Sequence, residues 1–166
     1  HTIPHPGEPG ADTWPADYWK TAGTPANWGF GSVDVARGLI FLPIGQPAAQ
    51  YYGGHRAQAN LYSSSVVALD ANTGKVRWSF QLTHHDVWDY DNAATPALID
   101  VVRNGRRIPA VVTTAKSGLM FFLERETGKP IYPVEERPVP ASDVPGEATW
   151  PTQPFPVKPP PLSRLS

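Results

Sequence analysis

The sequence predicts an all-β protein that contains two consecutive four-stranded antiparallel sheets. Three observations support this fold class. Short apolar runs of strand length alternate with turn residues, no segment shows a convincing helical period, and one motif occurs twice in the chain. Proline-rich arms flank the two sheets, and the chain has 20 prolines among 166 residues, against an ordinary usage of about 5%.

Four short segments form the first expected sheet. The pair Arg37-Gly38 has the composition of a hairpin turn, and Gly74 suits a turn position that requires a positive φ. The expected strands around these turns are residues 33–35, 39–42, 66–69 and 75–82.

The second expected sheet follows the same plan. The pair Asn104-Gly105 is a strong signal for a two-residue β-hairpin, and the sequence ETGK at residues 126–129 marks a second turn. Four strands are expected, the last of them weak: residues 97–101, 108–114, 119–123 and 130–134.

The two expected sheets share a motif. ALDANTGKVRW at residues 68–78 and FLERETGKPIY at residues 122–132 begin 54 positions apart. Both place Thr-Gly-Lys three residues after an acidic side chain, and an aromatic residue three positions after the lysine. A four-stranded unit that recurs at such a period is typical of propeller blades. The alternative is that two hairpins share their turn chemistry by chance, and two copies alone do not decide between these interpretations.

We expect the chain to divide into four segments. Residues 1–28 form an irregular arm rich in Pro, Gly and Trp, and residues 29–82 form the first blade. Residues 83–134 form the second blade, with a polar segment at its start, and residues 135–166 form an extended proline-rich tail. The tail is expected to be irregular because proline fixes φ and donates no hydrogen bond.

Composition excludes several classes of protein. Fourteen Lys and Arg against fifteen Asp and Glu leave a net charge of −1, so no basic footprint indicates nucleic acid as a partner. The absence of cysteine excludes disulfides and thiolate metal sites. No apolar run reaches the roughly 20 residues of a bilayer span. The first residues show neither an initiator Met nor a secretory signal, so we expect a processed or excised piece.

Several motifs relate the chain to a known family. ALD at residues 68–70, with TGK at residues 73–75 and Trp78, resembles the tryptophan-docking motif of quinoprotein dehydrogenases. In that family eight blades close into a propeller, and the tryptophan packs between neighbouring blades. The second copy departs from this pattern, with Glu124 for Asp and Tyr132 for Trp.

Segments outside the repeats resemble one subgroup of this family. HHDVWDYD at residues 84–91 is similar to a segment of membrane-type glucose dehydrogenases that use pyrroloquinoline quinone (PQQ), and TAKSG at residues 114–118 to their cofactor-contacting strand. EERPVP at residues 135–140 and PTQPF at residues 151–155 match the same subgroup. The resemblance implies a fragment of a PQQ-dependent dehydrogenase that oxidises an aldose or an alcohol by hydride transfer to PQQ.

The resemblance also implies roles for individual side chains. Asp89 matches the general base that takes the substrate hydroxyl proton, and Lys116 matches a cation that stabilises charge on the reactive carbonyl region of PQQ. Trp28 matches the indole on which the planar cofactor stacks. Each residue has a structural alternative as well, namely a turn aspartate, a solvated lysine and a packing tryptophan.

A metal site is implied by the same resemblance. Gln46 stands where the family commonly has an Asn ligand, and its amide oxygen can ligate Ca²⁺, although the longer side chain changes the reach. Asp89 and Asp91 would share a face if they lay on a strand, and a solvated Asp91 is the alternative. Ca²⁺ is the expected metal, with Mg²⁺ and lanthanides as alternatives. His84 and His85 would point to opposite faces of a strand, so structural roles are expected for both.

The resemblance implies partners and a location. Ubiquinone or a cytochrome would accept the electrons, in the bacterial periplasm, with any membrane attachment through parts absent from this chain. Two blades expose flanks that the remaining blades or self-association would cover, and the fragment alone is expected to be inactive. The alternative is a non-catalytic propeller that binds other proteins, which has no reason to keep Trp28, the residues 88–91 and Lys116 together.

Overall fold

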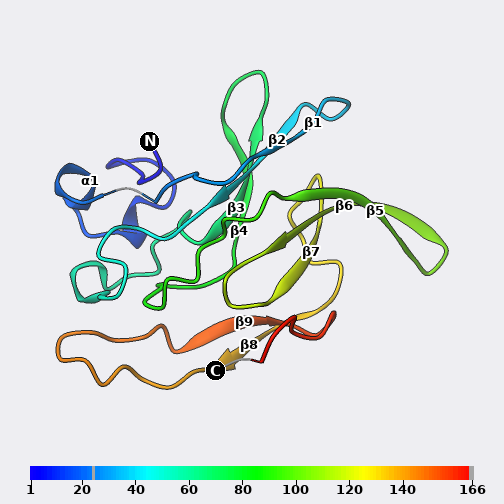
Figure 1. The fold of residues 1–166 in the computed structure, drawn as a ribbon. Coiled ribbons are helices and arrows are strands. Elements are labelled where there is room, and N and C mark those ends of the chain that lie inside the picture. The colour runs from blue at the N-terminus through cyan, green and yellow to red at the C-terminus, as the bar shows by residue number, and fades with distance from the viewer. Residues whose placement is uncertain (24, 165–166) are drawn as a thin grey trace.

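The computed structural model describes residues 1–23 and 25–164. Three antiparallel sheets follow one another along the chain, and the helical segments of this part are single turns (Figure 1). The all-β prediction is confirmed. Residue 24 of the expected N-terminal arm and residues 165–166 of the expected tail lie outside the described residues.

The first sheet has the four expected strands in sequential order. Gly38 and Gly74 take positive φ values of 61° and 69° in its turns, a conformation that glycine adopts without a steric penalty. Ala68 lies at its centre, opposite Phe41 on one side and Trp78 on the other. The strands are β1 (Ser32–Asp34), β2 (Leu39–Ile44), β3 (Ser65–Asp70) and β4 (Val76–Gln81).

The second sheet has three strands, so the prediction of a fourth strand over residues 130–134 was wrong. That segment is reduced to one isolated bridge between Leu123 and Pro130, because Pro130 and Pro133 have no N–H for a ladder. Asn104-Gly105 forms the predicted two-residue turn, with φ values of 51° and 73°. The strands are β5 (Ala97–Arg103), β6 (Arg106–Thr114) and β7 (Met120–Glu124).

The expected irregular tail contains a third sheet that its prolines concealed. β8 (Val134–Pro138) pairs with β9 (Thr152–Pro156) in an antiparallel hairpin that lies beneath the second sheet in Figure 1. Each strand has only one neighbour, which leaves positions where proline removes no hydrogen bond. Phe155 of β9 packs against the core of the two larger sheets, so the tail is attached to the rest of the molecule.

The N-terminal arm also holds more structure than expected. Ile3, Trp14 and Tyr18 form a small buried cluster, and Trp14 Nε1 donates to the carbonyl of Leu61 at 3.0 Å. None of the helical turns in residues 1–23 and 25–164 is long and apolar enough to cross a membrane. These turns are η1 (Ala11–Thr13), α1 (Tyr18–Thr21) and, between β2 and β3, η2 (Gly54–Arg56).

A shared apolar core joins the first two sheets. Phe80 of β4 contacts Phe121 of β7, with ring centroids 5.4 Å apart, and Phe121 is almost fully buried. Burial of apolar surface is the main favourable contribution to folding, so the two sheets stabilise one another. The buried members of this core are Leu39, Phe41, Val66, Ala68, Leu82, Val111, Leu119, Phe121 and Leu123.

Trp78 extends from the first sheet onto the second. Its Nε1 donates to the carbonyl of Arg125 at 3.1 Å, and a Cβ added to Gly128 would lie 2.6 Å from the indole. The tryptophan therefore packs between neighbouring sheets, as the resemblance implied. Tyr132, its counterpart in the second copy, instead packs edge-on against Phe122 of its own sheet, with ring centroids 5.5 Å apart.

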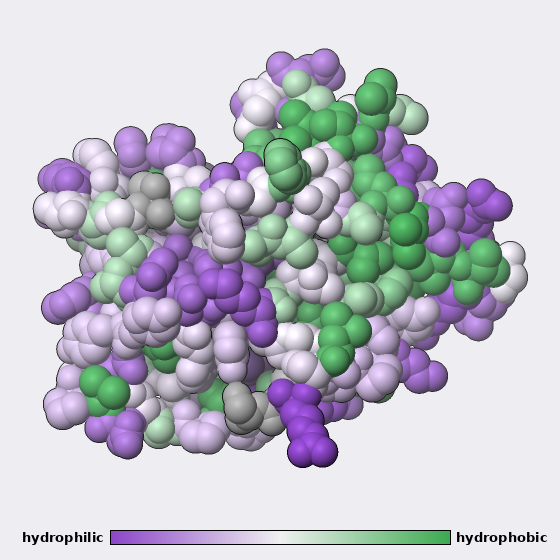
Figure 2. Space-filling view, viewed as in Figure 1, coloured by the Kyte–Doolittle hydropathy of each residue, from purple (hydrophilic) through white to green (hydrophobic). Residues whose placement is uncertain are grey.

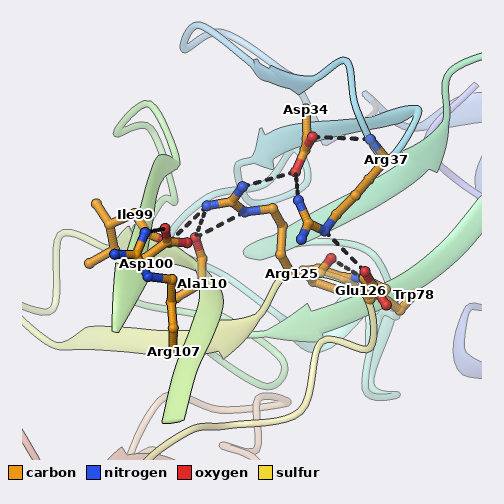
Figure 3. Close-up of polar contacts among 9 residues, drawn as sticks. All are labelled: Asp34, Arg37, Trp78, Ile99, Asp100, Arg107, Ala110, Arg125 and Glu126. Atoms are coloured by element: carbon orange, nitrogen blue, oxygen red, sulfur yellow. Dashed lines mark hydrogen bonds and ion pairs between the residues drawn. The ribbon is translucent and has the colours of Figure 1, made fainter. Parts of the chain in front are cut away.

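Charged side chains reinforce the same junction (Figure 3). Arg125 donates to Asp34 at 2.9 Å and to the carbonyl of Ile99 at 2.7 Å. Arg37 donates to the same carboxylate at 3.1 Å and to Glu126 at 3.0 Å. Burial opposes ionisation of Asp34, but the hydrogen bonds from Arg125 and Arg37 outweigh this effect and hold its pKa below the usual range.

Apolar side chains remain exposed at the flanks of the two larger sheets. Val33 and Val35, in and just after β1, and Val102 of β5 are all more than half exposed. Figure 2 shows hydrophobic surface gathered where Figure 1 places β1 and the β5–β6 hairpin. Because β1 and β5 are edge strands in their sheets, their free edges can pair with further strands.

We predict that Gly128→Ala destabilises the protein more than Gly74→Ala does. Both glycines adopt the left-handed backbone conformation, with φ values of 71° and 69°. Alanine therefore costs about 1–2 kcal/mol of backbone strain at either position. A Cβ at Gly74 meets nothing within 4 Å, whereas one at Gly128 meets Trp78, which should add about 1–3 kcal/mol. Thermal unfolding of both variants measures the difference, and equal midpoints would contradict the role of Trp78.

Candidate active site

The predicted site residues converge where the first two sheets meet. Gln46 follows β2, Asp89 and Asp91 lie in the segment between the sheets, and Lys116 lies in the β6–β7 loop. Lys116 Nζ donates to Asp89 Oδ2 at 2.9 Å and to Asp91 Oδ2 at 2.7 Å. The backbone N–H of Lys116 also donates to the carbonyl of Asp91 at 3.1 Å, so the loop as well as the side chain is held against this segment.

The backbone around Asp89 is a sharp turn. The prediction that Asp89 and Asp91 share a strand face was wrong in its premise, because neither residue lies in a strand. Asp89 has a φ of 63°, in the left-handed region that few residues other than glycine adopt. Both carboxylates reach Lys116 because of this turn.

The lysine favours the ionised form of Asp89. Burial opposes ionisation of Asp89, but the hydrogen bond from Lys116 helps to outweigh this effect and hold the pKa of Asp89 below its usual range. The hydrogen bonds to Asp91 and Asp89 raise the pKa of Lys116 above its usual range. Asp89 is therefore a carboxylate at neutral pH, as an acceptor of a proton must be.

Gln46 lies against both carboxylates. Its backbone N–H donates to Asp91 Oδ1 at 2.8 Å, and its Nε2 donates to Asp89 Oδ1 at 3.0 Å. Its Oε1 is buried without a hydrogen-bond partner, although buried polar atoms are ordinarily paired. Amide and carboxylate oxygens are the ligands that a hard cation such as Ca²⁺ takes, so the three predicted ligands suit the implied metal in their chemistry. Residues 1–23 and 25–164 hold no group of three or more His, Cys, Asp or Glu side chains that could bind a metal.

Trp28 stands beside this cluster with its ring open to solvent. The side chain is 59% exposed, and Lys116 Nζ lies 5.5 Å from the ring centroid. A Cβ at Gly45 would lie 2.5 Å from Asp91 Oδ1 and 3.0 Å from Trp28 Nε1, so the glycine allows these two side chains to approach the backbone. An exposed indole next to a cation can bind a flat, negatively charged ring.

A cavity that sequence reasoning missed is lined by Trp88 and Tyr90, the two chain neighbours of Asp89. Tyr51 lines the cavity and its hydroxyl donates to Asp89 Oδ2 at 3.5 Å. The cavity has a volume of about 450 Å³ and lies between the segment around Trp88 and the β8–β9 loop, whose Glu147 accepts a hydrogen bond from the N–H of Gly53 at 2.6 Å. Ser117 also lines the cavity and its Oγ is buried without a partner, so the cavity offers a hydrogen-bonding group to a polar ligand.

The two adjacent histidines make structural contacts. His84 contacts Gln81 Oε1 at 2.8 Å and Glu136 Oε1 at 3.1 Å. His85 is buried, and its Nδ1 contacts the carbonyl of Gln58 at 2.9 Å. Burial and the neighbouring Arg56 lower the pKa of His85. Neither histidine lies in a strand, so the expectation of opposite strand faces was wrong in its premise, but these contacts agree with the structural roles expected for the pair.

Two charged residues behind the site were also missed. Asp86 and Arg56 are fully buried, and Asp86 accepts a hydrogen bond from the N–H of Trp88, two residues further along. An Asp that precedes a turn at this spacing is a recognisable Asx-turn signal. The signal was therefore present in the sequence, whereas the burial of Arg56 depends on contacts between distant segments.

Consecutive antiparallel sheets with carboxylates, a lysine and an exposed indole at their junction agree with the propeller fold and the clustered residues that the resemblance implied. Residues 3–166 match the model of the PQQ glucose/ethanol/alcohol dehydrogenase β-propeller domain. The chain therefore belongs to this family of quinoprotein dehydrogenases.

Individual relatives agree with this assignment. The chain is 47% identical over 143 residues to the glycerol dehydrogenase large subunit of Gluconobacter thailandicus, covering 84% of this chain and 19% of that protein. It is 38% identical over 152 residues to the quinoprotein glucose dehydrogenase of Escherichia coli (strain K12), covering 90% of this chain and 19% of that protein. The quinohaemoprotein alcohol dehydrogenase of Comamonas testosteroni has a TM-score of 0.72 at 26% identity, covering 95% of this chain and 25% of that chain. The chain thus spans about a fifth of the length of these curated relatives.

We predict that Lys116→Met raises the pKa of Asp89. Burial favours the protonated acid, and without the ammonium group its main opponent, the hydrogen bond from Lys116, is lost. The ion pair stabilises the folded protein above the ordinary carboxyl pKa, and this contribution is lost as the pH falls through the lowered value. The variant should therefore lose stability at neutral pH and match the wild type in strong acid.

Carboxyl ¹³C NMR titration of Asp89, together with thermal unfolding at both pH values, measures these effects. Lys75→Met is the matched control, because Lys75 is an exposed lysine of the β3–β4 turn. An unchanged pKa of Asp89 in the Lys116 variant would show that the ion pair does not control its ionisation.

Proposed function

We propose that the chain forms part of a PQQ-dependent dehydrogenase that oxidises an aldose sugar or an alcohol. The observation that carries this proposal is the cluster of Lys116 with two carboxylates beside the exposed ring of Trp28. Membership of the PQQ family supports it. The relatives named above are dehydrogenases of glycerol, glucose and alcohol, which supports a hydroxyl-bearing substrate and adds polyols to the class.

Residues of this chain would hold the cofactor from two sides. The exposed face of Trp28 would stack on its flat ring, and Lys116 would place a positive charge beside a ring oxygen. When bound, PQQ supplies the acceptor for the hydride of the substrate carbon. The oxygen atoms of Gln46, Asp89 and Asp91 would ligate Ca²⁺, with Mg²⁺ and lanthanides as alternatives.

Asp89 would act as the proton acceptor. Its carboxylate is ionised by its contact with Lys116 and is only partly covered, with a side chain that is 20% exposed. A substrate hydroxyl within hydrogen-bond reach could transfer its proton to this group as the hydride leaves the carbon. Tyr51, whose hydroxyl already contacts Asp89, would border the same position.

The proposal extends to partners and location. Ubiquinone or a cytochrome would accept the electrons, and the name of the Comamonas testosteroni relative indicates haem in that protein. Further blades would cover the exposed apolar flanks around Val33, Val35 and Val102. A bacterial periplasm is the proposed location, with any membrane attachment through parts outside this chain.

We predict that the full-length protein, reconstituted with PQQ and Ca²⁺, oxidises members of an aldose, polyol and alcohol panel in a dye-linked assay. Asp89→Asn should lower kcat by about 10²–10⁴-fold, because the amide cannot accept the proton. Asp70→Asn, which changes a carboxylate at the end of β3, should keep wild-type turnover. Folded wild-type protein that neither turns over nor binds PQQ would instead favour a non-catalytic propeller.

We predict that Trp28→Ala weakens PQQ binding by up to about tenfold, since aromatic stacking contributes roughly 0.5–1.5 kcal/mol. Trp28→Phe should retain most of the affinity because it keeps an aromatic face. Calorimetric titration of the full-length apoprotein with PQQ measures both variants. Equal affinities for Trp28→Ala and the wild type would remove Trp28 from the cofactor site.

A further inference from the structure

A buried carboxylate that the proposed reaction does not use lies three residues before Asp89. Asp86 is 0% exposed. Its Oδ1 accepts hydrogen bonds from the N–H of Trp88 at 3.0 Å and from the N–H of Tyr90 at 3.2 Å. Its Oδ2 accepts from the hydroxyl of Ser64 at 2.8 Å.

Two of these hydrogen bonds are made by the residues immediately before and after Asp89. The N–H groups on either side of Asp89 both point to one oxygen of Asp86, so the backbone has to turn sharply between them. Asp89 stands at this turn with its φ of 63°. A left-handed residue other than glycine persists where surrounding contacts enforce it, and Asp86 provides two such contacts.

Asp86 is itself held from the buried side. Arg56, which is also 0% exposed, donates through Nη2 to the backbone carbonyl of Asp86 and through Nη1 to Asn60 Oδ1 at 3.0 Å. His85 Nδ1 contacts the same oxygen of Asn60 at 3.2 Å. The carboxylate of Asp86 therefore has a fixed position from which to shape the turn.

We propose that Asp86 is a positioning residue that holds Asp89 in its left-handed turn, where the carboxylate reaches Lys116 and Gln46. The catalytic consequence rests on the proposed function, while the geometric consequence does not. Full burial keeps Asp86 from touching a substrate, so its effect on the reaction passes through the placement of Asp89. Small displacements of a reacting group cost large factors in rate.

Two substitutions at position 86 in the full-length protein separate this role from a merely structural one. Asp86→Ala removes the acceptor of both N–H groups, and should lower kcat per bound PQQ by about 10–100-fold with little change in KM. Asp86→Asn keeps an acceptor oxygen for these groups and can donate to the Ser64 hydroxyl, so its kcat should stay close to the wild-type value.

Asp70→Ala is the matched control. Asp70 Oδ1 likewise accepts from two backbone N–H groups, those of Asn72 at 3.1 Å and Thr73 at 2.9 Å, but it lies at the end of β3, outside the candidate site. Its loss should leave kcat per bound PQQ unchanged. Crystal structures without PQQ give a second readout, and Asp86→Ala should show a negative φ at Asp89 and a broken contact with Lys116, which is 2.9 Å long in the wild type.

Wild-type kcat per bound PQQ in Asp86→Ala, or an unchanged turn and ion pair in its crystal structure, would overturn the proposal. If Asp86→Ala does not fold, Ser64→Ala removes the contact to Oδ2 alone. It should lower kcat in the same direction by a smaller factor, and no change would count against Asp86. A wild-type protein without PQQ-dependent turnover would reject the proposed function, and the crystal structures would then decide the role of Asp86 separately.

Discussion

The packing of Trp78 against the backbone of Gly128 fixes one contact between the first two sheets, and the candidate site lies where these sheets meet. Gln46 is carried by the first sheet, Lys116 by the second, and Asp89 by the segment between them. A movement of one sheet relative to the other would separate the lysine from its carboxylates. The charged contacts around Asp34 lie at the same junction, so the interactions that stabilise the two sheets also preserve the geometry of the site.

Local patterns predicted most of the strands because the turns between them are made by local chemistry. Asn104-Gly105 and Gly74 adopt the positive φ values that their sequence indicated. The missing fourth strand of the second sheet and the unexpected β8–β9 hairpin both involve proline. Pro130 and Pro133 have no N–H to donate, and the expected strand is reduced to one bridge. β8 and β9 pair with each other although both contain proline, so proline content alone does not separate the two cases.

The site residues that could be predicted are those that belong to a recognisable sequence motif. The resemblance singled out Asp89, Asp91 and Lys116, and the structure brings them together, although through a left-handed turn instead of a strand. Their roles in a reaction remain predictions. Tyr51 and Arg56 were missed because their positions depend on contacts with residues roughly thirty or more positions away, and short-range patterns contain no record of such contacts.

The left-handed backbone at Asp89 restricts what evolution can place there. Among residues with a side chain, Asp and Asn tolerate this conformation best, whereas a β-branched residue would be strongly disfavoured. A neighbour of this sequence that exchanged Asp89 for Asn would keep the same backbone and lose only the negative charge. Exchange for Glu would lengthen the carboxylate while adding backbone strain. Asp is therefore the one residue type that supplies a negative charge at position 89 and also tolerates its left-handed backbone.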